Sequence, residues 1–97
     1  MSEPPELTEF ESAVLALVGS LDPGDIMSYG EVAAEVGKPG AARAVGSTLR
    51  RHGSSVPWWR IVAANGRLVP GGEERHRAHL AAEGIEVRNG RVVMGGR

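Results

Sequence analysis

The sequence predicts one small domain, mainly α-helical with small β-hairpins, arranged as a winged helix-turn-helix-like domain. Its 97 residues suit a single modest core, so we expect one domain over residues 1–97. In the first half, two capping-box patterns precede apolar residues at helical spacing. In the second half, Asn-Gly pairs at 65–66 and 89–90 lie between apolar runs, a pattern that favours hairpins.

The first helix is predicted over residues 8 to 20. Thr8 and Glu11 have the spacing of a capping box, in which each side chain accepts a hydrogen bond from the other residue's backbone. Asp22-Pro23-Gly24 ends the pattern. The apolar residues at helical intervals are Phe10, Val14, Leu17, Val18 and Leu21. Because the other face is acidic, we expect this helix to be a scaffold.

The next two helices are predicted to form the helix-turn-helix. Ser28 and Glu31 make a second capping box at the start of a short helix. Gly37-Lys38-Pro39-Gly40 ends that helix, and another runs from Ala41 to Arg51. Two short helices joined by a glycine-containing turn are typical of this motif.

The helix over 41–51 is rich in small residues. Arg43, Arg50 and Arg51 add positive charge to it. Small side chains let a helix lie close to a DNA backbone, and arginines neutralise phosphates. A tightly packed core helix with solvated arginines is the alternative. We favour DNA contact, because Ala and Gly contribute little hydrophobic burial but permit close approach. The small residues are Ala41, Ala42, Ala44, Gly46 and Ser47.

The second half is predicted to contain two hairpins around a polar helix. The apolar run that starts at Ile61 is expected to turn at 65–66 and return through Leu68 and Val69. A polar helix follows over 73–83 and is closed by Gly84. Apolar and polar residues alternate over 85–93, on both sides of the second Asn-Gly pair, and this pattern predicts the second hairpin. This last hairpin could form a wing or only cap the core.

The charge is divided along the chain. Residues 1–37 hold eight acidic residues and no basic ones, whereas residues 38–97 hold eleven Lys and Arg and four acidic residues. The two parts therefore carry −8 and +7, which sum to the net charge of −1. This division fits a basic DNA-contacting face opposed by an acidic, solvated one. Segregation of charge between elements that pack together explains it equally well.

The chain has no cysteine. Disulfides, thiolate zinc sites and thiol nucleophiles are therefore excluded. No apolar run approaches the roughly 20 residues of a membrane span, and the acidic N-terminus does not look like a secretory signal. From these observations we expect a soluble cytoplasmic protein without a membrane partner, a metal or a cofactor.

Three segments together resemble the C-terminal domain of the O6-alkylguanine-DNA alkyltransferases, and the resemblance covers nearly the whole chain. They are Pro57-Trp58-Trp59-Arg60-Ile61-Val62, Ser28-Tyr29-Gly30-Glu31 and Ala41-Ala42-Arg43-Ala44-Val45-Gly46-Ser47. In that family the first motif reads Pro-Cys-His-Arg-Val, and its cysteine accepts the alkyl group. Tryptophan at the cysteine position is the hallmark of the alkyltransferase-like proteins, whose usual motif is similar to Pro-Trp-His-Arg.

The motif differs from the family at two chemical positions. Trp58 stands at the cysteine position and Trp59 at the histidine position, which departs even from the alkyltransferase-like pattern. Alkyl transfer requires a thiolate activated by an adjacent base, and an indole is neither nucleophilic enough nor basic. The resemblance therefore implies a protein that is not an enzyme. Glu83 matches the carboxylate that orients the family's histidine, and here we expect it to make only a helix C-terminal hydrogen bond.

The resemblance also implies the site residues. Tyr29 corresponds to the tyrosine that helps rotate the target nucleotide, and Arg43 to the arginine that enters the base stack. Trp58 would line the lesion pocket, Trp59 is either pocket or plain core, and Arg60 is expected to brace the Pro57 loop through backbone carbonyls. DNA contacts are expected from Ser28, Tyr29, Ala41, Ala42, Arg43, Gly46, Ser47 and Arg50, and the lesion pocket from Tyr29, Pro57, Trp58, Trp59 and Arg60.

Three functions are compatible with these features. The leading hypothesis is a monomer that binds double-stranded DNA carrying O6-alkylguanine and presents it to nucleotide excision repair proteins. A winged-helix transcriptional regulator is less favoured, because the helix over 41–51 has no Asn or Gln to read base edges. An enzyme such as a glycosylase would need a general base or nucleophile. Glu73, Glu74, His76 and His79 are instead expected on a solvated helix face, and the spacing of the two histidines is too weak a signal for a metal site.

Overall fold

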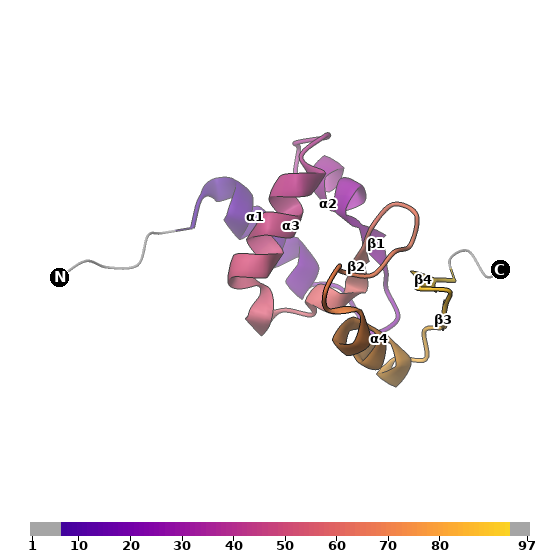
Figure 1. Ribbon diagram of the computed structural model, residues 1–97. Helices are drawn as coiled ribbons and strands as arrows, with labels where there is room; N and C mark the ends of the chain where they lie inside the picture. The colour runs from indigo at the N-terminus through magenta and orange to yellow at the C-terminus, as the bar shows by residue number, and fades with distance from the viewer. Residues whose placement is uncertain (1–6, 94–97) are drawn as a thin grey trace.

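The computed structural model describes residues 7–93 and is mainly helical, as predicted. Its helices are α1 (Glu9–Gly19), α2 (Tyr29–Glu35), α3 (Ala42–His52) and α4 (Glu73–Ala82). The strands are β1 (Met27–Ser28), β2 (Ile61–Val62), β3 (Val87–Arg88) and β4 (Arg91–Val92), and two 3₁₀ turns cover Gly53–Ser55 and Trp58–Arg60. Helices α1 to α3 gather on one side of the molecule, while α4 and the β3–β4 hairpin lie on the other (Figure 1).

Both predicted capping boxes are present. The Glu11 backbone N–H donates to the Thr8 hydroxyl at 3.0 Å, and the Thr8 N–H donates to the Glu11 carboxylate at 3.0 Å. The same reciprocal pair joins Ser28 and Glu31, at 3.0 and 2.8 Å. These side chains satisfy backbone donors that have no partner inside the helix, which explains why α1 and α2 begin where the sequence indicates.

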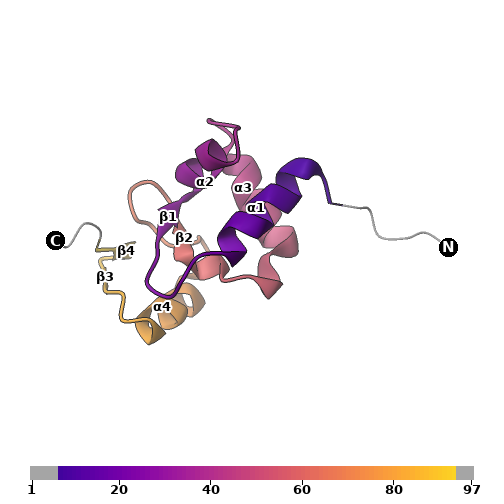
Figure 2. The same ribbon diagram turned by 180° about the vertical axis from the view of Figure 1, so that it is seen from behind.

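The core has two parts that meet at β2. Ile61 packs into the first cluster, which α1, α2 and α3 surround. Its neighbour Val62 packs into the second cluster, under α4. Successive strand residues point to opposite faces, so this two-residue strand joins the two clusters. The first cluster is Val14, Val18, Val32, Ala33, Val45 and Ile61, and the second is Val62, Leu68, Leu80 and Val92. From behind, α1 lies across α3 and covers the first cluster (Figure 2).

The predicted hairpin over residues 61–69 forms only at its turn, where the Ala63 N–H donates to the Arg67 carbonyl at 3.0 Å. The Asn-Gly turn itself forms, because the Gly66 N–H donates to the Ala63 carbonyl at 2.8 Å and Gly66 has a φ of 85°. However, β2 pairs in parallel with β1, with Met27 opposite Ile61. Both faces of β2 are buried, which favours an interior partner from a distant part of the chain over an exposed local one.

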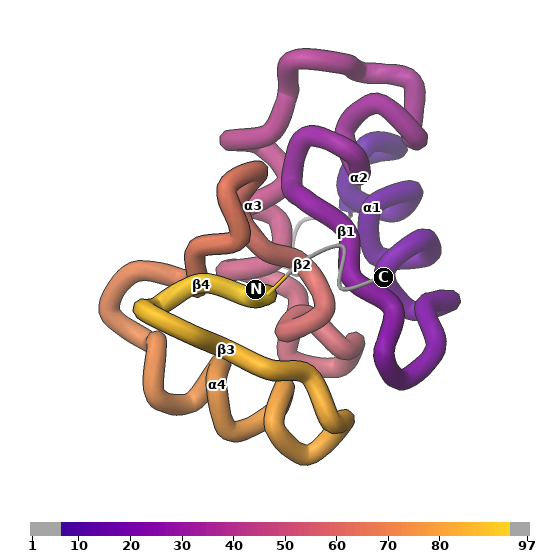
Figure 3. The backbone as a smooth tube through the Cα atoms, turned by 90° about the vertical axis from the view of Figure 1, so that its right-hand side faces the viewer, coloured from indigo at the N-terminus to yellow at the C-terminus, as the bar shows by residue number. Residues whose placement is uncertain are grey.

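The C-terminal hairpin is confirmed. Strands β3 and β4 are antiparallel, with Val87 opposite Val92 and Arg88 opposite Arg91. Asn89 and Gly90 have φ values of 56° and 75°, as a type I′ turn requires. Val92 is buried in the second cluster, so one face of the hairpin caps the core. Figure 3 shows β4 beside the segment that follows β2 and β3 beside α4.

Candidate nucleic-acid interface

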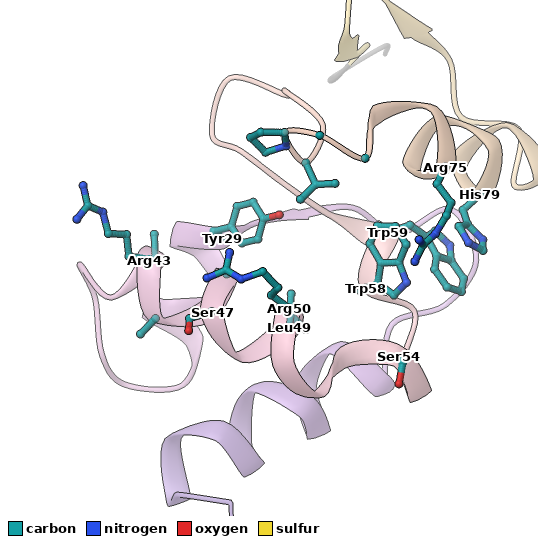
Figure 4. Close-up of a pocket in the computed structure, with 17 residues that line it drawn as sticks. Tyr29, Arg43, Ser47, Leu49, Arg50, Ser54, Trp58, Trp59, Arg75 and His79 are labelled. Carbon is teal, nitrogen blue, oxygen red and sulfur yellow. The ribbon is translucent and has the colours of Figure 1, made fainter.

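A groove of about 1210 Å³ separates α3 from the chain that leads into α4 (Figure 4). Its first wall is Tyr29 with the exposed side of α3, and its second wall is residues 69–72. Trp58, Trp59, Arg75 and His79 close the end between them. The groove therefore joins the predicted DNA-contacting helix to the predicted tryptophan motif.

Most of the predicted DNA-contacting residues line this groove. They are Tyr29, Ala42, Arg43, Gly46, Ser47 and Arg50. Ser28 lies outside the lining, because its hydroxyl caps α2 and the residue is buried. Ala41 is the N-cap residue of α3 and is also outside the lining. Ser28 therefore positions Tyr29, the first residue of α2, rather than forming the groove surface.

The arginines of α3 divide into two groups. Arg43 and Arg50 line the groove, and Figure 4 shows Arg43 extending into open space and Arg50 beside Tyr29. Arg51 instead forms a salt bridge with Glu11 of α1 at 3.3 Å. The inward face of α3 carries Val45 and Thr48, which are buried. Two cations of α3 therefore remain on the side that a ligand could approach.

Tyr29 packs closely on α3. A Cβ atom added at Gly46 would lie 3.8 Å from the Tyr29 ring, which is ordinary van der Waals contact, so the ring lies over this position of the helix. Burial raises the pKa of the Tyr29 hydroxyl, while the nearby Arg50 charge opposes that rise. The hydroxyl is therefore protonated at neutral pH and can donate a hydrogen bond to a phosphate.

Trp58 is the centre of an aromatic cluster. Its ring makes edge contacts with Trp59, His76 and His79, at centroid distances of 5.9, 5.1 and 5.5 Å. The Arg75 guanidinium lies 5.7 Å from the centroid of the Trp58 ring. Trp58 is only partly buried, so it presents part of its ring to the groove while its neighbours hold it in place.

Trp59 lines the groove and is also anchored to the protein interior. Its ring is stacked on His79, with centroids 4.2 Å apart and planes 10° apart. Its indole N–H donates to Glu83 Oε2 at 2.7 Å. In the resembling family, this carboxylate orients a histidine at the same motif position. Here the indole N–H supplies the hydrogen bond to Glu83, so the change to tryptophan leaves the carboxylate with a donor.

Glu83 does more than the predicted C-terminal hydrogen bond, and that prediction is corrected. Besides Trp59, its carboxylate accepts from Arg60 Nη2 at 2.6 Å and from the Gly24 N–H at 3.0 Å. The hydrogen bonds from Arg60 are the largest cause that lowers the pKa of Glu83 to about 2. Glu83 therefore ties the end of α4 to the motif and to the loop before β1.

Arg60 lies behind the groove. It is 8% exposed, and besides Glu83 it donates from Nη1 to the Leu21 carbonyl at 2.7 Å. Arg60 was predicted to brace the motif through backbone carbonyls. The bond to the Leu21 carbonyl is of this kind, whereas the bonds to the Glu83 carboxylate were not predicted. Neither Arg60 nor Pro57 lines the groove. Of the predicted pocket residues, the structure brings together Tyr29, Trp58 and Trp59.

His76 is buried, which corrects the expectation of a solvated helix face. Its Nδ1 accepts from the Val69 N–H at 3.0 Å, so the proton lies on Nε2, which donates to the Trp59 carbonyl at 2.8 Å. Burial lowers the pKa of His76. The neutral ring therefore connects two segments that line the groove, and neither of its nitrogens is free to act as a base.

Several groove residues were not predicted from the sequence. They are Ala44, Leu49, Ser54, Val69, Pro70, Gly71, Gly72, Arg75 and His79. Arg75 and His79 are four residues apart and so share one face of α4, which was a signal available in the sequence. Within residues 7–93, no three His, Asp or Glu side chains form a group that could hold a metal ion. In the same range, no helix is both long and apolar enough to cross a bilayer.

A helix-turn-helix beside an aromatic, cation-lined groove defines a DNA-binding domain, and comparisons with known proteins agree. Residues 9–85 match the family model for the 6-O-methylguanine DNA methyltransferase DNA binding domain. A DNA base-flipping protein of Vibrio parahaemolyticus is 35% identical over 93 residues, covering 91% of this chain and 93% of the relative. Alkyltransferase-like protein 1 of Schizosaccharomyces pombe is 33% identical over 87 residues, covering 84% and 81%.

A solved structure shares the fold. The crystal structure of Schizosaccharomyces pombe Atl1 in complex with damaged DNA containing O6-carboxymethylguanine superimposes with a TM-score of 0.77. The identity is 31%, over 87% of this chain and 83% of that one. The chain therefore belongs to the 6-O-methylguanine DNA methyltransferase DNA-binding-domain family, as an alkyltransferase-like member.

Proposed function

We propose that the protein binds O6-alkylguanine in duplex DNA through the minor groove, rotates the damaged nucleotide out of the helix and holds it without transferring the alkyl group. One observation carries this proposal. The positions that hold the acceptor cysteine and its histidine in the resembling alkyltransferases hold Trp58 and Trp59, and both tryptophans line a groove beside the helix-turn-helix.

The small side chains of α3 would permit the close approach. Gly46 and Ser47 face the groove, so little side-chain bulk separates the helix from a nucleic-acid backbone. Arg43, at the start of α3, would enter the base stack and occupy the space that the flipped guanine leaves. Tyr29 would crowd the target phosphate and favour its rotation. Flipping costs a few kcal/mol and less for a weakened pair, so an intercalating side chain offsets part of that cost.

The flipped base would be held by stacking. Each base stacked on an aromatic side chain gains roughly 1 to 3 kcal/mol, and Trp58 presents part of its ring to the groove. The O6 substituent would lie against the same aromatic wall. The chain has no thiol to accept the alkyl group, and both nitrogens of the nearby His76 ring are hydrogen-bonded. The alkyl group would therefore stay on the guanine until other proteins remove it.

This persistence is the basis for the proposed role in repair. A protein that holds a lesion and leaves it chemically unchanged contributes to repair only if another activity removes the damage. We include presentation of the bound lesion to nucleotide excision repair proteins in the proposal. A purified excision system acting on a duplex with one O6-alkylguanine would test it, and faster incision on adding the protein is the expected result.

Binding to matched duplexes tests the first part directly. The duplexes carry guanine, O6-methylguanine or O6-carboxymethylguanine at one central position, and affinity is measured by fluorescence anisotropy. The lesion duplexes should bind at least about tenfold more tightly, because stacking on Trp58 is added to the phosphate contacts. Equal affinity for all three duplexes would refute lesion recognition and would favour a transcriptional regulator. Release of free base would instead indicate a glycosylase.

A further inference from the structure

The C-terminal hairpin carries a row of arginines that the groove does not include. Arg88 lies directly opposite Arg91 in the β3–β4 pair, and Arg91 lies opposite Arg67 in an antiparallel bridge. The Val92 N–H donates to the Gly66 carbonyl at 2.8 Å, which holds the third segment in place. Residues directly opposite in antiparallel pairs point to the same face, so the three side chains form one row. All three residues are exposed.

This arrangement is costly for the protein alone. Like charges directly opposite each other in a sheet are destabilising, and here two such pairs share Arg91. Within residues 7–93, Arg88 has a salt bridge with Glu86, while Arg67 and Arg91 take part in none. The opposite face of the same hairpin places Val87 and Val92 on the core, so folding requires the valines but not the arginines.

The row begins close in the chain to a wall of the groove. Arg67 is two residues before Val69, which lines the groove wall opposite α3. Strands lie about 4.8 Å apart, so the row extends about 10 Å across three segments. Successive phosphates of one DNA strand rise about 3.4 Å each along the axis and lie farther apart along the strand, so such a row reaches about two to three of them. Arginine also pairs with phosphate through two parallel hydrogen bonds.

We infer that Arg67, Arg91 and Arg88 form a second phosphate-binding surface, which grips the duplex backbone beside the lesion, across the groove from α3. Of the three arginines of α3, Arg51 is paired with Glu11, so this helix supplies only Arg43 and Arg50 to the groove. The arginine row adds three charges on the opposite side. This inference rests on the proposed function for the placement of the DNA.

The salt dependence of DNA binding tests the row. We compare wild type with the triple variant Arg67→Gln, Arg88→Gln, Arg91→Gln, using lesion and undamaged duplexes between 50 and 200 mM salt. The slope of log K against log salt should become shallower by about 2 to 3, since each phosphate contact contributes about 0.9. Affinity should fall about tenfold or more for both duplexes, and the ratio between them should stay unchanged. Lysine at the same three positions should retain most of the slope.

Arg77→Gln is the matched control. Arg77 is exposed on α4 but does not line the groove, so its loss should leave the slope unchanged. An unaltered slope in the triple variant overturns the inference. The arginine row would then be better explained as a binding surface for an acidic protein. An equal change in Arg77→Gln also overturns it, because general charge would then be the cause. The single variant Arg91→Gln, which removes the centre of the row, gives the same test if the triple variant does not fold.

Two further measurements separate this inference from the proposed function. If wild type shows no lesion preference, lesion recognition fails, yet the slopes on undamaged duplex still decide the role of the row. Shortening the duplex on one side of the lesion should weaken wild type more than shortening it on the other, and the triple variant should lose this asymmetry. Equal sensitivity of wild type to both truncations contradicts a one-sided grip.

Discussion

The two halves of the molecule are held together by different kinds of contact. In the half that contains α1, α2 and α3, the first two helices begin at local capping boxes, and apolar side chains at helical spacing make the core. In the half after Pro57, the regular elements are short and polar contacts join segments far apart in the chain. Glu83 bonds Gly24, Trp59 and Arg60. The groove lies where the halves meet, so its shape depends on both.

Glu83→Gln should give the largest loss of stability. The Arg60–Glu83 pair is almost fully buried, with side chains 9% and 11% exposed. Removing one partner of such a pair leaves an uncompensated charge, and we expect a loss of about 3 kcal/mol in the free energy of unfolding, measured with denaturant. The matched control is Glu86→Gln, whose salt bridge with Arg88 is exposed and should contribute about 0 to 1 kcal/mol.

The pH dependence of stability identifies the same contact. Because the folded protein lowers the pKa of Glu83 from 4.5 to about 2, its stabilising contribution is complete above pH 4.5 and is lost as the pH falls toward 2. The difference in unfolding free energy between wild type and Glu83→Gln should therefore shrink across that window. A constant difference down to pH 2 would show that the carboxylate charge is not what stabilises this half.

His76→Ala should have the next largest effect. The substitution opens a cavity and leaves the Val69 N–H and the Trp59 carbonyl without their partner, so we expect about 2 kcal/mol of lost stability. His79→Ala is the matched control on the same helix, because His79 is only partly buried. It should change the unfolding free energy by less than about 1 kcal/mol. Lesion binding should nevertheless weaken in both variants, since each histidine contacts a tryptophan of the groove.

Acid should expose the role of His76 separately from that of Glu83. Burial lowers the pKa of His76 below the 6.5 of an exposed histidine, so the unfolded chain takes up this proton first as the pH falls. Wild type should therefore lose stability below pH 6.5, before Glu83 begins to titrate. A variant without His76 should lack this first decrease, as measured by thermal unfolding at a series of pH values.

The same contrast explains what the sequence could predict. Helices α1 to α3 were predictable because their signals are local: capping boxes at the start of α1 and α2, apolar residues at helical spacing, and glycine-containing turns after α1 and α2. Trp58, Tyr29 and Arg43 could be assigned to one site only through their motifs, and the structure places all three along the groove. The pairing of β2 with β1, the burial of His76 and the bond from Trp59 to Glu83 were not, because each joins residues at least 17 positions apart. Hydrophobic pattern carries no information about such partners.

Tyr29→Ala and Arg43→Ala should separate binding from folding in the helical half. Tyr29 is partly buried and Arg43 is exposed, so neither is a fully buried core side chain. We expect each variant to lose at least about tenfold in affinity for lesion duplex, since the orphaned base and the target phosphate would lose their partners. The unfolding temperature should stay close to wild type for Arg43→Ala. Wild-type affinity in both variants would contradict base flipping.

Trp58→Cys should produce no alkyl transfer, although it places a thiol at the family's acceptor position. A thiol with an ordinary pKa is mostly protonated at neutral pH, and attack on the alkyl group requires a base beside it. Trp59 occupies the histidine position, and its indole N–H is committed to Glu83 at 2.7 Å. Mass spectrometry after incubation with O6-methylguanine duplex should therefore show the unmodified protein.

The double variant Trp58→Cys, Trp59→His tests whether a histidine beside the thiol restores alkyl transfer. Glu83 already accepts from the residue at position 59, so an imidazole there could take over that bond and direct its other nitrogen toward the thiol. Methylation of the double variant but not of the single one would show that both tryptophans together prevent alkyl transfer. Methylation of the single variant would show that a neighbouring group other than residue 59 activates the thiol, which His76 cannot do while both its nitrogens are bonded.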